Sequence, residues 1–131
     1  MISLNRHSRI DNDQYGHLNN SIYYHLFDSI TNTYLAKQCG HSPQDSPQIG
    51  LVVHSHCDYF AGTEFPCVLD VCLRVNKLGK SSVTYEIGVF EQGKDEVAAV
   101  GEFVHVFVER QGRRPGEYLN SLIIIALVPV A

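Results

Sequence analysis

The sequence predicts an α+β domain in which one antiparallel sheet packs on a single buried helix. The first observation is one stretch, residues 22–38, whose apolar side chains recur every four residues, as on one face of a helix. The second is a series of later segments rich in β-branched and aromatic residues, with turn-forming residues between them. A single sheet with a helix on one of its faces accommodates this inventory.

The helix is predicted over residues 22–38. The apolar positions along its face are Ile22, Leu26, Ile30 and Tyr34. Further aromatic residues widen this face, so we expect the helix to be well buried. Asn19 or Asn20 would supply the N-cap, and Gly40 would follow the last turn.

The predicted strands lie on both sides of this helix. Residues 2–9 are compatible with a short edge strand, and a loop containing Pro43 and Pro47 follows the helix over residues 41–48. Four strands are then predicted over residues 51–60, 66–76, 81–90 and 96–109. The hairpin-type turns between them, at residues 79–80 and 92–95, make neighbouring strands antiparallel.

The totals describe one globular domain. The 131 residues are 44% hydrophobic and 18% charged, which suits a folded chain with one core. The formal net charge of −4 argues against broad nucleic-acid binding, so no nucleic-acid partner is expected. The four cysteines form no CxxC pair and follow no signal peptide, so we expect free thiols and a cytoplasmic location.

The C-terminal end differs in character from the rest of the chain. We expect a domain over residues 1–114 and an atypical apolar tail over residues 115–131. The apolar run at residues 122–131 is about half as long as a bilayer span requires, so no membrane partner is expected. The tail fits a further strand, a segment docked at a subunit contact, or a sequence scar.

The most informative stretch is Asp11-Asn12-Asp13-Gln14-Tyr15-Gly16-His17-Leu18-Asn19-Asn20, directly before the predicted helix. It places carboxylates, an imidazole and amides at a helix start, where backbone N–H groups point outward and the helix dipole favours negative charge. Acyl transfer needs a carboxylate that attacks or activates water, and donors that hold an oxyanion. The stretch therefore predicts hydrolysis of an acyl compound, although an Asp here also fits a simple capping role.

This stretch resembles the D-x-D-x-x-G-H-x-N-N pattern of hotdog-fold acyl-CoA thioesterases of the 4-hydroxybenzoyl-CoA thioesterase type. Tyr23 and Tyr24 match the aromatic residues of that family just inside the helix, and residues 78–82 resemble its hairpin between long strands. The resemblance, which spans residues 4–110, implies the hotdog fold, a curved antiparallel sheet wrapped around one long central helix. It also implies a homodimer with a continuous sheet, commonly paired again into a homotetramer, with active sites at the subunit boundary.

The resemblance further implies an acyl-CoA substrate, cleaved to a carboxylate and free coenzyme A. Asp13 matches the catalytic carboxylate of the family, acting as nucleophile or as general base on water. His17 and Asn19 match polar positions beside it, and Tyr15 or His17 would assist departure of the thiolate. No cofactor is expected, because a thioester is an activated electrophile. His17 also suits a histidine that bonds backbone at a turn, and Asn19 also suits a cap.

A basic and hydroxylated cluster at the predicted hairpin is the candidate for binding the coenzyme A moiety of the substrate. Its members are Lys77, Lys80, Ser81 and Ser82, with Arg74 nearby. Such groups suit phosphates, and they equally suit a solvated turn. An alternative patch for the phosphates consists of Arg110, Arg113 and Arg114.

The segment His54-Ser55-His56-Cys57-Asp58 offers ligands of the kind that metals prefer. On a strand, His54, His56 and Asp58 would share one face. No second ligand pair follows at the spacing of structural zinc sites, and polar strand faces often carry histidine, so no metal is expected.

Two rival functions remain open from the sequence. One is a hotdog hydratase or dehydratase acting on hydroxyacyl thioesters, although its usual histidine and downstream acidic pattern is absent. The other is a non-catalytic protein that binds acyl thioesters, in which the carboxylate at position 13 would be replaced.

Overall fold

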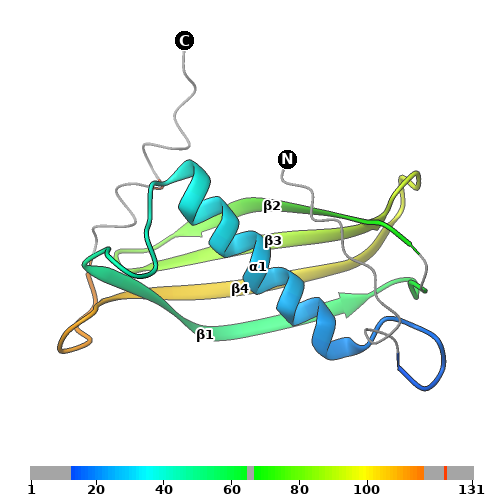
Figure 1. Ribbon diagram of the computed structural model, residues 1–131, viewed down its shortest axis with the longest axis horizontal. Coiled ribbons are helices and arrows are strands. Elements are labelled where there is room, and N and C mark those ends of the chain that lie inside the picture. The colour runs from blue at the N-terminus through cyan, green and yellow to red at the C-terminus, as the bar shows by residue number, and fades with distance from the viewer. Residues whose placement is uncertain (1–12, 65–66, 117–122, 124–131) are drawn as a thin grey trace, which may run out of the picture.

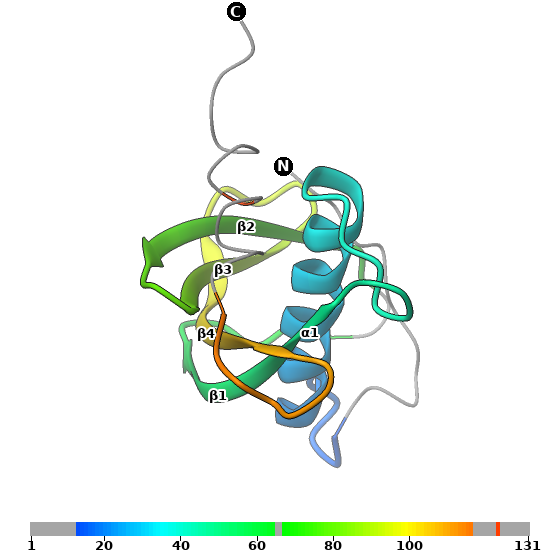
Figure 2. The ribbon, with the colours of Figure 1, turned by 90° about the vertical axis from the view of Figure 1, so that its left-hand side faces the viewer.

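The computed structural model describes residues 13–64, 67–116 and 123. The elements follow in the order α1 (Asn20–Gln38), β1 (Gln48–Tyr59), β2 (Leu69–Leu78), β3 (Ser82–Glu91) and β4 (Val97–Glu109). The strands form one antiparallel sheet in the order β1-β4-β3-β2. Helix α1 crosses the sheet diagonally (Figure 1), and the end-on view shows the sheet curving around it (Figure 2). The predicted hotdog architecture is confirmed.

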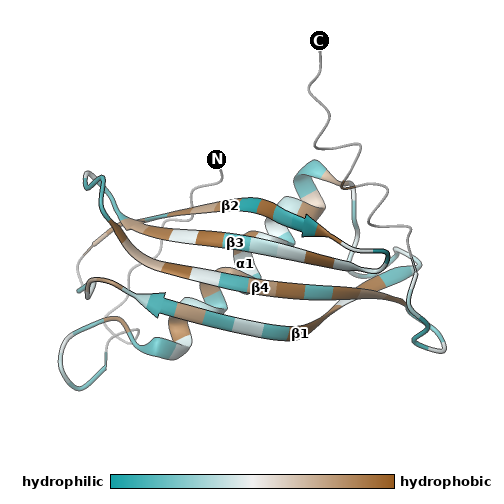
Figure 3. Cartoon of the chain, turned by 180° about the vertical axis from the view of Figure 1, so that it is seen from behind, coloured by the Kyte–Doolittle hydropathy of each residue, from teal (hydrophilic) through white to brown (hydrophobic). Residues whose placement is uncertain are grey.

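The core lies between α1 and the concave face of the sheet. The helix contributes Tyr23, Leu26, Phe27, Ile30, Tyr34 and Leu35, and the sheet contributes mainly Val71, Val83, Tyr85, Ile87, Phe103 and Phe107. Gly101 of β4 lies beneath the helix, where an added Cβ would overlap the ring of Phe27. The missing side chain therefore lets α1 approach the sheet closely. Apolar and polar residues alternate along the strands, as Figure 3 shows from the outer face.

Both ends of α1 have capping residues. Asn19 is the N-cap, and its Oδ1 accepts the Ser21 N–H at 3.1 Å. At the other end Cys39 is the C-cap, and Gly40 follows with a φ of +67°, the left-handed conformation expected of a glycine after a last turn. Of the two asparagines that the sequence offered as caps, the structure uses Asn19.

The four strands keep their predicted order, with shifted ends. Strand β1 begins at Gln48 instead of residue 51, because Gln48 pairs with Glu109 at the end of β4. Strand β2 begins at Leu69 and runs to Leu78, which pairs with Val83 across the hairpin. The sheet register shifts between Val52 and His54, so β1 bulges at this point. Strand pairing, which composition does not encode, sets these ends.

Two sequence predictions fall outside the described residues. These are the strand at residues 2–9 and nearly all of the tail from residue 115. Ile123 is the one described residue after Gly116, and it is fully buried in the core. Within the described part of the chain, no helix is long and apolar enough to cross a membrane.

Candidate active site

The loop before α1 is organised around Asp13. Its backbone N–H donates to the His17 carbonyl at 2.7 Å, and its Oδ1 accepts the N–H groups of Tyr15 at 2.8 Å and His17 at 3.2 Å. Gly16 completes the turn with a φ of +80°, which favours glycine. These bonds hold one carboxylate oxygen of Asp13 in place. The second oxygen accepts no hydrogen bond from the described residues.

A second segment, residues 61–64 after β1, holds this loop in place. The Leu18 N–H donates to the Thr63 carbonyl at 2.7 Å, and His17 Nε2 lies 3.2 Å from Glu64 Oε1. A Cβ at Gly62 would lie 3.0 Å from the His17 ring, so the missing side chain leaves room for the imidazole. The start of α1 is thereby joined to the end of β1.

A cleft of about 330 Å³ opens where the two segments meet. Its lining residues are Asp13, His17, Leu18, Asn20, Tyr23, Tyr59, Phe60, Ala61 and Gly62. Polar groups of the loop and helix start thus face aromatic rings from α1 and the end of β1. The rings of Tyr23 and Tyr59 meet edge to face, with centroids 5.1 Å apart. The cleft therefore offers a carboxylate beside an apolar wall, as an acyl group requires.

The aromatic wall of the cleft is uncharged. Burial raises the pKa of the Tyr23 hydroxyl above its ordinary value, and the hydrogen bond with Thr63 opposes this rise only in part. Its Oη lies 3.3 Å from Thr63 Oγ1. Burial also raises the pKa of Tyr59. Both phenols stay protonated at neutral pH, so no phenolate repels the Asp13 carboxylate.

The N-terminus of α1 supplies one backbone donor to the same cleft. The Asn19 cap satisfies the Ser21 N–H, and the Asn19 carbonyl accepts the Ile22 N–H at 2.9 Å. The Asn20 N–H comes first in the helix and has no acceptor among the described residues. Because Asn20 lines the cleft, this N–H and the positive end of the helix dipole favour a developing negative charge there.

The arrangement is chemically that of an acyl-transfer site, and the family comparison agrees with it. Residues 15–98, more than half of the chain, match the Thioesterase superfamily. The chain belongs to the thioesterase superfamily. It is a thioester hydrolase, as the sequence predicted. The matched range begins two residues after Asp13, so this match does not reach the carboxylate.

Solved structures of similar proteins extend the comparison over nearly the whole chain. The PA5185 protein from Pseudomonas aeruginosa is 44% identical, with a TM-score of 0.86 over 99% of this chain and 91% of that one. A thioesterase from Thermus thermophilus, in complex with coenzyme A and zinc, is 25% identical, with a TM-score of 0.77 over 95% and 96% of the two chains. The PA2801 protein from Pseudomonas aeruginosa, 21% identical over 97% and 96%, shares the fold with a TM-score of 0.87. No curated protein matches the chain.

Of the four site residues that the resemblance to the thioesterases predicted, two line the cleft and two do not. It brings Asp13 and His17 together at the cleft. Tyr15 is 82% exposed and is not part of the cleft lining. Asn19 acts as the helix cap, with its side-chain oxygen engaged by Ser21.

Sequence reasoning missed the segment at residues 61–64 that completes this cleft. Thr63 and Glu64 bond the motif loop. These residues lie about 45 positions downstream, at the end of a strand, and no spacing rule connects them to the motif. Gly62 was the one local signal, because a glycine beside a strand end often marks a close approach.

The predicted coenzyme A patches lie elsewhere in the chain. The β2–β3 hairpin with Lys77, Lys80, Ser81 and Ser82 is at the end of the sheet opposite the motif loop (Figure 1). Near that same end, Arg110 donates to the carbonyls of Ser46 at 3.1 Å and Pro43 at 2.5 Å, so it anchors a loop. The guanidinium of Arg74 pairs with the Glu86 carboxylate. No patch of this subunit therefore adjoins its own Asp13.

Proposed function

We propose that this thioester hydrolase cleaves acyl-CoA and that Asp13 is its catalytic carboxylate. The observation that carries the proposal is the position of Asp13 in a cleft shared with the N-terminus of α1. Coenzyme A as the thiol agrees with the thioesterase from Thermus thermophilus, whose structure contains that molecule.

In the proposed reaction the thioester carbonyl lies against the Asn20 N–H. The second oxygen of Asp13 attacks the acyl carbon, the C–S bond breaks, and coenzyme A leaves as a thiolate. Water then cleaves the mixed anhydride and restores the carboxylate. Alternatively, Asp13 takes a proton from water, which attacks the carbonyl directly. In both routes the oxyanion forms at the helix N-terminus, beside the Asn20 N–H.

His17 is the group best placed to assist the leaving thiolate. Its Nε2 is held 3.2 Å from the Glu64 carboxylate, which orients the ring beside Asp13. A thiolate leaves readily, so this assistance contributes less to the rate than the carboxylate does. Tyr15 would act here only if a neighbouring subunit brought the substrate to it.

We also propose that the protein is a homodimer joined along β1, with a tetramer as a pair of such dimers. Exposed large apolar residues on β1 or directly after it are Val52, Val53, Tyr59 and Phe60. Among the described residues β1 pairs on one edge only, with β4. Pairing with a second copy would satisfy the other edge and cover these side chains.

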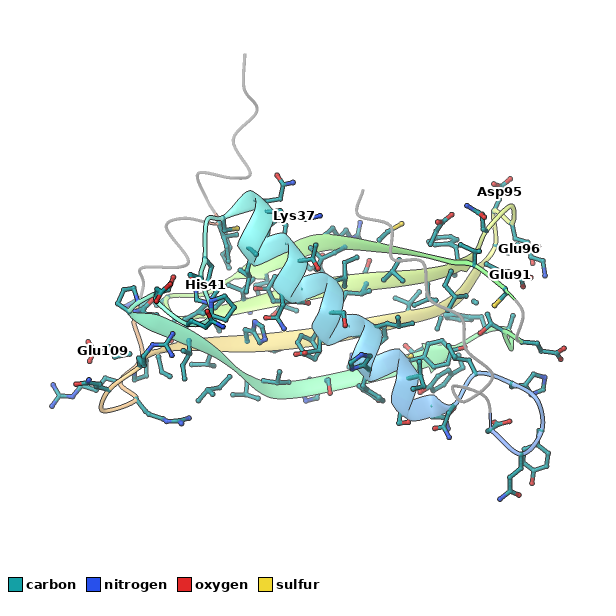
Figure 4. All side chains as sticks on the ribbon, viewed as in Figure 1. Lys37, His41, Glu91, Asp95, Glu96 and Glu109 are labelled. Atoms are coloured by element: carbon teal, nitrogen blue, oxygen red, sulfur yellow. The ribbon has the colours of Figure 1, made fainter. Side chains whose placement is uncertain are left out.

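Such a dimer offers a place for the hairpin of Lys77 and Lys80. If two β1 strands pair antiparallel, the hairpin end of one subunit lies at the end of the continuous sheet that carries the partner's motif loop. The hairpin lysines would then contact coenzyme A phosphates from the neighbouring subunit. Within one subunit, the sheet end that carries the motif loop also carries Glu91 at the end of β3, paired with Lys94, and the acidic Asp95 and Glu96 of the β3–β4 turn, so this end is net acidic (Figure 4).

We propose a cytoplasmic location for the enzyme. All four cysteines, which are Cys39, Cys57, Cys67 and Cys72, are free thiols. Free thiols persist in a reducing compartment.

Thiol release from short-chain, long-chain and aromatic acyl-CoA substrates tests the proposal, with absorbance of an enoyl-CoA followed in parallel. The account expects free coenzyme A from at least one substrate. A change in enoyl absorbance without thiol release would identify a hydratase instead. Binding of acyl-CoA with neither reaction would identify a non-catalytic protein.

A further inference from the structure

A cluster of potential metal ligands lies outside the thioesterase cleft. His54 and His56 of β1 and Glu102 of β4 place one ligand atom each within 4.8 Å of one another. His56 is the register partner of Glu102, and its Nε2 lies 2.5 Å from Glu102 Oε2. The rings of His54 and His56 have centroids 5.7 Å apart.

Strand geometry places the three side chains on the outer face of the sheet, the face seen in Figure 3. Residues two apart on a strand share a face, so His54 and His56 point the same way. The next residue along each strand points the other way. Cys57 on β1 and Phe103 on β4 pack toward the core and α1. The cluster is therefore on the opposite side of the sheet from the helix and from the catalytic cleft.

We propose that His54, His56 and Glu102 bind a divalent transition-metal ion of the Zn²⁺ type. Two imidazoles and one carboxylate form a ligand set that zinc accepts, with a fourth position left for water. Tetrahedral ligation at about 2.0–2.2 Å places ligand atoms about 3.3–3.6 Å apart. His56 and Glu102 must separate slightly to admit the ion, and their side chains, 48% and 36% exposed, have room to do so.

An ion pair between His56 and Glu102 explains two of the three side chains without a metal. It does not involve His54, whose exchange would leave that pair intact. His54 therefore distinguishes a metal site from a surface ion pair. The sequence alone favoured no metal, because the third ligand comes from a strand 46 residues after His56.

Zinc titration of the untagged, chelator-treated protein tests the proposal, with a chromophoric chelator as competitor. We expect one Zn²⁺ per chain. We expect His54→Gln and Glu102→Gln each to weaken binding by more than ~10-fold. The matched control is Asp58→Asn, which removes a carboxylate from the same face of β1 outside the cluster and should change the affinity by less than ~3-fold. Far-UV circular dichroism checks that each variant is folded.

Cobalt provides a second readout, because thiolate ligands give Co²⁺ an intense charge-transfer band that imidazole and carboxylate do not. We expect a Co²⁺ complex without that band, lost in His54→Gln. The affinity should also fall as the solution is acidified, because protons compete for the imidazoles. The proposal is overturned if the wild-type protein binds no zinc, if His54→Gln binds as tightly as wild type, or if the thiolate band is present.

Discussion

The buried imidazole of His105 makes the stability of this fold depend on pH. His105 is on the inner face of β4, 3% exposed, with the rings of Tyr85, Phe103 and Phe107 at centroid distances of 5.2–5.6 Å. Burial, with a smaller contribution from the nearby His41, lowers the pKa of His105 from the ordinary 6.5 to about 4. His41, close to the C-terminal end of α1 (Figure 4), is itself buried with a lowered pKa.

The sign and size of the effect follow from these values. The pKa of His105 is lower in the folded state, so the unfolded chain takes up the proton first as the pH falls. The stabilisation is fully present above about pH 6.5 and is lost between there and about pH 4. Between about pH 7.5 and pH 5, proton uptake favours the unfolded state by roughly 30-fold, or about 2 kcal/mol. Well below pH 4 the loss reaches about 3 kcal/mol.

Urea unfolding of the wild type and of His105→Gln at several pH values measures this contribution. The chain has no tryptophan, so far-UV circular dichroism is the suitable signal. His41 and the carboxylates are present in both proteins, so their titration cancels in the difference, apart from the small coupling between His41 and His105. We expect the wild type to lose about 2 kcal/mol more than the variant between about pH 7.5 and pH 5.

A difference between the two proteins that stays constant over this pH range would refute the reasoning. NMR titration of the wild type gives an independent check that does not depend on the variant. The His105 ring resonance should stay at its neutral position down to about pH 5. A midpoint near the ordinary 6.5 would mean that water reaches the ring.

Two further predictions concern α1. Gly101→Ala should lower the free energy of unfolding by about 1–3 kcal/mol, because the added Cβ overlaps the Phe27 ring. Adding Phe27→Leu to this variant should recover part of the loss. An unchanged urea midpoint for Gly101→Ala would contradict the packing. Asn19→Ala should lower stability by about 1 kcal/mol through loss of the cap and change the rate of thiol release by less than ~3-fold, whereas a ~100-fold slower rate would place Asn19 in the reaction.

Local signals predicted the architecture of this protein because each acts within a few residues. The four-residue apolar spacing from Ile22 to Tyr34 predicted the helix, and Gly40 correctly predicted its end. The strand order β1-β4-β3-β2 and the early start of β1 at Gln48 depend on pairing with β4, about 60 residues away. Such pairing is a property of the folded chain.

In the candidate site, too, the residues of one local motif were predicted and those of a distant segment were not. Asp13 and His17 were predicted from one contiguous motif and are together at the cleft. Glu64, which pairs with His17, belongs to a different segment with no motif of its own. The role of Asn19 could not be predicted from the sequence, because a helix cap and a catalytic amide would both place an asparagine at this position. Only the bond to Ser21 distinguishes the two roles.

The rate of thiol release by Asp13→Asn, compared with wild type on its best acyl-CoA substrate, tests the central proposal most directly. Asparagine keeps the oxygen that accepts the Tyr15 and His17 N–H groups, so the loop should remain folded. We predict a loss of at least ~10²-fold in rate with an unchanged urea midpoint. A folded Asp13→Asn variant that releases thiol as fast as wild type would contradict the proposal that Asp13 carries the chemistry.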